Sequence, residues 1–119
     1  MARLCVVMLH STDEPDLAVA GLEVAHAATK DGRPVAMWLA SEGVRLGVRG
    51  VAETLSGHGR PDVAGWLAEV IAGGGRVLLS RRDFEARGFE AAAVVPGASV
   101  AGPEALAALV EEGFVPASF

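Results

Sequence analysis

The chain contains very little cysteine. Cys5 is the only cysteine among 119 residues, so no disulfide can form within the chain. It sits inside an apolar segment, where burial favours the neutral thiol over the reactive thiolate. We therefore expect Cys5 to be a buried, inert side chain with a raised pKa, and not a redox centre.

Tyrosine is absent, and Lys30 is the only lysine. Acidic residues outnumber basic residues by 15 to 10, which gives a net charge of -5. A chain of this charge has no general attraction to nucleic acids or to anionic membranes. No apolar run reaches the roughly 20 residues of a membrane-spanning helix, and the first residues lack the pattern of a signal peptide. The sequence predicts a cytoplasmic protein with no nucleic-acid partner and no membrane partner.

Hydrophobic residues, in contrast, are abundant. They make up 51% of the chain, and the mean hydropathy is +0.38. A chain of this length can bury about two thirds of its unfolded surface in one core, so we expect residues 1–119 to form a single domain. Apolar surface that one small domain leaves exposed favours self-association. The composition therefore predicts a homo-oligomer.

Apolar runs alternate along the chain with segments of helical periodicity. The runs predict five strands, at 2–9, 33–40, 76–79, 99–101 and 113–119. The periodic segments predict helices at 17–30, with Asp16 as its cap, and at 43–47, 62–72, 81–87 and 103–112. The glycine-rich stretch from 48 to Pro61 is expected to be a surface loop that carries His58. Such alternation is typical of an α/β protein, here a three-layer α/β/α fold with a five-stranded, mostly parallel sheet.

Polar side chains follow the first three predicted strands. In a parallel sheet, residues just beyond the carboxyl ends of the strands line a common crevice, which is where ligands bind. The predicted site therefore collects residues from three segments of the chain: His10, Ser11, Thr12 and Asp13; Ser41 and Glu42; and Ser80, Arg81, Arg82 and Asp83.

Ser80 has two interpretations. Its hydroxyl is a nucleophile if His10 or Glu42 lies within hydrogen-bonding distance as a base. No Gly-x-Ser-x-Gly motif surrounds Ser80, however, and a serine at the end of a strand commonly hydrogen-bonds to nearby backbone. We favour the capping or ligand-contacting hydroxyl over the nucleophile.

The other polar residues give no stronger signal of chemistry. The three histidines have no metal-ligand spacing, so the sequence predicts no metal and no cofactor. Arg81, Arg82 and Arg87 can bind a small anion through their guanidinium groups. Because Asp83 and Glu85 alternate with these arginines, we favour pairing of the charges with one another or with a neighbouring subunit.

Four segments carry a resemblance to a known family: Leu39–Val44, Ser80–Gly88, Pro96–Gly102 and Ala117–Phe119. Together with the order of predicted elements, they make the chain similar to the DsrE/DsrF-like family over essentially its whole length. The resemblance implies a small α/β domain with a five-stranded parallel sheet, assembled as a trimer or hexamer. The best-understood members of this family relay sulfur as a cysteine persulfide.

The chain departs from the family pattern at the sulfur-carrying position. The family cysteine precedes an Arg-Gly pair by seven residues, and here Arg87-Gly88 places Ser80 at that position. Asp83 stands where relatives have a second cysteine. The resemblance therefore implies a non-catalytic module that binds a ligand or a partner. Two alternatives are an enzyme that uses Ser80, His10 and Glu42, and an inactive subunit that assembles with a cysteine-bearing paralogue.

Overall fold

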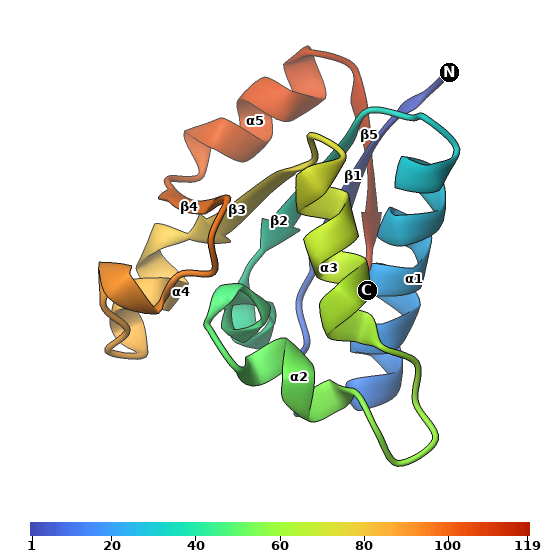
Figure 1. The fold of residues 1–119 in the computed structure, drawn as a ribbon. Helices are drawn as coiled ribbons and strands as arrows, with labels where there is room; N and C mark the ends of the chain where they lie inside the picture. The colour runs from blue at the N-terminus through green and yellow to red at the C-terminus, as the bar shows by residue number, and fades with distance from the viewer.

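The computed structural model describes residues 1–119 and contains one five-stranded sheet (Figure 1). All neighbouring strands are parallel, in the order β4-β3-β2-β1-β5. The predicted α/β class is confirmed, and the sheet is parallel throughout. The strands are β1 (Arg3–Met8), β2 (Val35–Leu39), β3 (Arg76–Ser80), β4 (Ala98–Ala101) and β5 (Phe114–Ser118).

Helices lie on both faces of the sheet. α1 and α3 contact each other and cover one face, whereas α5 crosses the other face between β4 and β5 (Figure 1). This arrangement is the predicted three-layer α/β/α fold. The α-helices are α1 (Pro15–Lys30), α2 (Val51–Leu55), α3 (Val63–Ala72), α4 (Arg81–Ala86) and α5 (Glu104–Glu111); two 3-10 helices are η1 (Ser41–Gly47) and η2 (Ala91–Ala93).

The two faces of the sheet have cores of unequal size. Successive strand residues point to opposite faces, so Val6 and Met8 join the core of 20 buried residues beneath α1 and α3. Cys5 and its neighbour across the strands, Ala36, face α5 in a core of only five buried residues. Cys5 is fully buried, and burial raises the pKa of its thiol, as expected from the sequence.

The predicted cap of the first helix is wrong. α1 begins at Pro15, and Glu14 occupies the capping position. The backbone carbonyl of Glu14 accepts hydrogen bonds from the N–H groups of Leu17 and Ala18. Proline favours the first helical position because it has no N–H to leave unpaired there. Asp16 therefore lies inside the first turn.

The predicted loop from 48 to Pro61 is wrong in part, because it contains the short helix α2. Ala52 and Leu55 are buried in the larger core, which holds this five-residue helix against α3. His58 lies beyond α2 on an exposed turn, as expected. Across the whole fold, none of the helices combines the length and the apolar character needed to cross a membrane.

Candidate functional site

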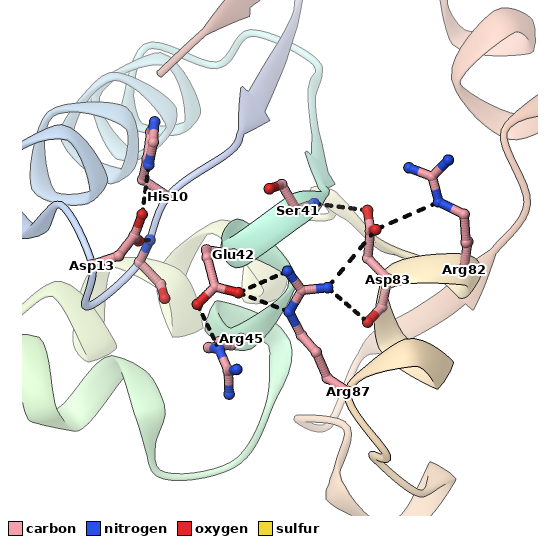
Figure 2. Close-up of polar contacts among 9 residues, drawn as sticks. His10, Asp13, Ser41, Glu42, Arg45, Arg82, Asp83 and Arg87 are labelled. Atoms are coloured by element: carbon pink, nitrogen blue, oxygen red, sulfur yellow. Dashed lines mark hydrogen bonds and ion pairs between the residues drawn. The ribbon is translucent and has the colours of Figure 1, made fainter.

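The candidate site lies where β1, β2 and β3 end (Figure 2). η1 begins directly after β2, and its Gly43 packs against the backbone carbonyl of Met8 at the end of β1. A Cβ atom on Gly43 would collide with that carbonyl, so this close approach requires glycine. Glycine at position 43 thereby places Ser41 and Glu42 at the common end of the strands.

Asp83 fixes the start of η1 from the other side. The backbone N–H of Ser41 donates a hydrogen bond of 2.7 Å to the Asp83 carboxylate, which comes from α4 (Figure 2). Ser41 has φ 53°, in the left-handed region that non-glycine residues adopt at a cost of about 1 kcal/mol. Asp83 is buried, and its charge-assisted hydrogen bond offsets the cost of this conformation.

Glu42 joins η1 to the end of α4 through arginines. Nη2 and Nε of Arg87 lie 2.7 and 2.8 Å from the Glu42 carboxylate. Nη1 of Arg87 donates a hydrogen bond of 3.1 Å to the backbone carbonyl of Asp83. Arg45, one turn along η1, approaches the second Glu42 oxygen with its Nε at 3.0 Å. Figure 2 shows Glu42 enclosed between these two guanidinium groups.

These contacts lower the pKa values of both carboxyl groups. For Asp83, the hydrogen bond from the Ser41 backbone is the main cause of the lowered pKa, with smaller contributions from the Ser80 hydroxyl, Arg82 and Arg87. For Glu42, the hydrogen bonds from Arg87 and then Arg45 lower the pKa. Both carboxylates are therefore charged at neutral pH and are paired with arginines within the chain.

His10 belongs to a separate pair beyond β1. Its Nδ1 lies 2.8 Å from Oδ2 of Asp13, and the backbone N–H of Ser11 donates to the other Asp13 oxygen at the same distance. Desolvation by burial acts to raise the pKa of Asp13, but the hydrogen bonds from His10 and Ser11 outweigh it, so the pKa is lowered. The Ser11 side chain is fully buried and its hydroxyl has no hydrogen-bond partner, whereas Thr12 is exposed.

Ser80 is buried and precedes the first residue of α4, but its hydroxyl makes no capping hydrogen bond to that helix. The predicted capping hydrogen bond to α4 is therefore absent. The Ser80 hydroxyl contributes instead to the lowered pKa of Asp83, and its role as a ligand contact stays a prediction. Arg81 is exposed and makes no ion pair. The structure thus connects Ser41, Ser80 and Asp83, and keeps His10 with Asp13.

Arg45 is the residue of these networks that the sequence analysis does not name. Its spacing is a usable signal, because Arg45 follows Glu42 by three residues. Arg87 pairs with carboxylates, as the sequence analysis favours, but its main partner Glu42 lies 45 residues away in the sequence. Only the packing of α4 against η1 reveals that pairing.

The polar side chains at the strand ends pair mainly with groups other than Ser80. No hydrogen bond joins Ser80 to His10 or to Glu42. No cluster of three or more His, Cys, Asp or Glu side chains is placed to hold a metal ion. The two main cavities of the molecule, of about 420 and 570 Å³, are lined by other residues. Exposed residues at the strand ends include Thr12, Ser41, Arg81 and Arg82.

Comparison with known proteins identifies the fold. No family profile matches the sequence, and no curated protein is significantly similar to it. Among solved structures, the ychN protein from E. coli matches with a TM-score of 0.83 at 18% identity, over 100% of both chains. The protein of unknown function MTH1491 from Methanobacterium thermoautotrophicum matches with a TM-score of 0.79 at 15% identity, also over 100% of both chains.

A third structure, the conserved protein of unknown function BT1422 from Bacteroides thetaiotaomicron, is less similar. It matches with a TM-score of 0.64 at 16% identity and covers 97% of this chain and 94% of its own. At these identities the comparisons establish a common fold. The chain has the YchN-like α/β fold, which is the fold implied by its resemblance to DsrE/DsrF-like proteins.

Proposed function

We propose that the protein is an oligomeric, non-catalytic module related to intracellular sulfur relay, which binds a small ligand or a partner protein at the ends of its strands. The proposal joins the fold to the residues that occupy the candidate site. A fold alone does not define a function, so the argument depends on those residues.

The observation that carries the proposal is the chemistry of Ser80, Asp83 and Cys5. A persulfide requires a thiol, and the strand-end positions that carry thiols in relay proteins hold a hydroxyl and a carboxylate here. The single thiol of the chain, Cys5, lies in the middle of β1 and is fully buried beneath α5. Its raised pKa further disfavours the thiolate that sulfur transfer requires.

The enzyme alternative requires a base for Ser80. His10 is hydrogen-bonded to Asp13, and Glu42 is held by two arginines that lower its pKa. A carboxylate with a lowered pKa is a weak base, which makes Glu42 poorly suited to activate a hydroxyl. These contacts favour a binding role over nucleophilic catalysis. The discriminating result would be a catalytic turnover that Ser80→Ala abolishes.

The uneven covering of the sheet supports the proposed self-association. The face of the sheet that carries Cys5 and Trp38 is covered only by the eight-residue helix α5. Apolar side chains around this small core remain only partly buried, among them Val7, Leu78 and Ala101. A second copy that packs there would remove this surface from water. The proposed assembly is a trimer or a hexamer.

The test is a sulfur-loading experiment. The protein is incubated with a cysteine desulfurase, cysteine and pyridoxal phosphate, and its mass is measured without reductant. We expect no persulfide on the parent protein, because Cys5 is inaccessible in the folded chain. Stable gain of a sulfur atom by the parent protein would contradict the proposal.

Two variants calibrate this experiment. Ser80→Cys returns a thiol to the strand end, and Ser118→Cys places one on the exposed surface of β5. Sulfur uptake by the first variant but not by the second would show that the assay detects a carrier and that position 80 remains accessible to a donor. Co-purification with a cysteine-bearing paralogue would identify that paralogue as the partner.

A further inference from the structure

A second candidate site lies away from the strand ends, between α2, α3 and the loop that precedes β4. It is a cavity of about 420 Å³, within the range of small-molecule sites in proteins. In Figure 1, α2 lies at the lower end of the view, and it contacts α3. None of the residues predicted from the sequence to form the strand-end site lines this cavity.

The walls of the cavity are apolar, and small side chains keep it open. Ala64, Ala68 and Ala72 recur every four residues along α3 and line one wall. The mostly buried side chains of Leu67 and Val48 also line the cavity. An aliphatic group that packs against these apolar walls would be removed from water. The cavity therefore suits a ligand with a short hydrophobic side chain.

Two opposite charges lie on the wall formed by α2 and the residues just before it. Arg49 uses its Nε to hold the backbone carbonyl of Ala92, at 3.1 Å, so that the planar guanidinium is anchored. The side chain of Arg49 makes no ion pair, and neither does that of Glu53, although both line the cavity. One free cation and one free anion next to an apolar wall are complementary to a zwitterion.

We propose that this cavity binds a free aliphatic amino acid, with its carboxylate on Arg49, its ammonium group on Glu53 and its side chain against the alanines of α3. A guanidinium group binds a carboxylate through two parallel hydrogen bonds, which suits Arg49 to the carboxylate. A simple fatty acid has no ammonium group to pair with Glu53, and its carboxylate would lie near the negative charge of Glu53. The pair of charges therefore selects for an amino acid.

The experiment is an NMR titration of the full chain with leucine. Two related molecules test each charge separately: 4-methylpentanoate lacks the ammonium group, and isopentylamine lacks the carboxylate. We expect leucine to shift the amide signals of residues 48–53 and 64–72, and each analogue to bind about tenfold more weakly, the equivalent of one lost charge-assisted contact at a solvated site.

Substitutions in the cavity test whether leucine binds there. Arg49→Gln and Glu53→Gln are each expected to weaken leucine binding by about tenfold, since each removes one charged contact. Ala68→Leu fills the cavity and should abolish binding, whereas Ala107→Leu, on the exposed side of α5, should leave it unchanged. Circular dichroism establishes that the two leucine variants are folded.

Several results would overturn the proposal. They are the absence of shifts at millimolar leucine, shifts confined to other segments, and equal binding of leucine and 4-methylpentanoate. Shifts at residues 64–72 that depend on protein concentration without ligand would assign this surface to a second copy of the chain, and would also overturn it. None of these outcomes bears on sulfur loading, so the two proposals are tested independently.

Discussion

At the scale of single residues, Asp83 has the most consequential contacts in the candidate site. It accepts a hydrogen bond from the backbone N–H of Ser41 and lies 3.8 Å from Nη1 of Arg87. Relatives of this chain would have a thiol at this position, according to the resemblance in sequence. Here a buried carboxylate connects α4 to η1, so the position has a structural role that a thiol could not fill equally well.

Replacing Asp83 should therefore destabilise the protein. Asp83→Ala removes the acceptor of the Ser41 N–H, and we expect the free energy of unfolding at pH 7 to fall by about 1–3 kcal/mol. Urea denaturation followed by circular dichroism measures this change. Glu23→Ala, at an exposed position of α1 without an ion pair, is the control and should change the free energy by less than about 0.5 kcal/mol.

Asp83→Ala should also change how the stability of the protein depends on pH in acid. The folded protein lowers the pKa of Asp83, so the carboxylate stabilises the fold above its ordinary pKa of about 3.9. That contribution is lost as the pH falls through the lower folded value. The decrease in stability below about pH 4 should be shallower in Asp83→Ala than in the parent protein. Equal slopes would mean that the pKa of Asp83 is not lowered by folding.

Most residues of the candidate site were predictable from their positions at strand ends, but their contacts were not. Ser41 and Asp83 each follow a predicted strand, yet 42 residues separate them in the sequence. No local pattern shows that the carboxylate of one meets the backbone of the other. The pairing of Ser80 with His10 or Glu42 was a hypothesis of the same kind, and the hydrogen bonds of His10 and Glu42 go to other residues.

At the scale of secondary-structure elements, the sequence predicted the strands well because each strand combines apolar residues with clear breaks. Gly73–Gly75 separates α3 from β3, and the predicted strand 76–79 differs from the observed one by a single residue. α2 was missed because its five residues are too few to establish a helical period. Its stability comes from burial of Ala52 and Leu55, which is a tertiary effect.

The position of η1 depends on one glycine. Gly43→Ala adds a Cβ atom that would collide with the Met8 carbonyl, and the obstacle is backbone of Met8 and Leu9, which cannot turn aside as a side chain can. We expect a loss of about 3 kcal/mol in the free energy of unfolding. Gly74→Ala is the control, because it adds no contact and should cost only about 1 kcal/mol for its left-handed backbone.

Thermal or urea unfolding of both glycine variants measures this difference. An equal loss in the two variants would show that η1 can move away from β1 without strain. In that case Gly43 would not be required for the geometry of the candidate site.

At the scale of the whole molecule, the sheet is covered unequally. α1 and α3 bury a core of 20 residues on one face, while α5 buries five residues on the other. The sequence indicated excess apolar character, with a mean hydropathy of +0.38, but it could not tell where the excess lies. The structure shows that part of this excess apolar surface lies around the small core beneath α5.

This imbalance predicts the state of the protein in solution. Light scattering at micromolar concentration should give three or six times the 12.2 kDa of one chain. A polar change at the thinly covered face, Leu78→Glu, should reduce the measured mass, whereas Leu17→Glu at an exposed position of α1 should not. A mass of one chain for the parent protein would contradict the predicted assembly.

The order of the strands also has a consequence for biosynthesis. β1 is made first, but one of its two neighbours in the sheet is β5, which follows α5. Until residues 114–118 have left the ribosome, one side of β1 has unpaired backbone groups and can join strands from other nascent chains. Slow translation of the last helix would therefore prolong the period in which the growing polypeptide is prone to aggregate and depends on chaperones.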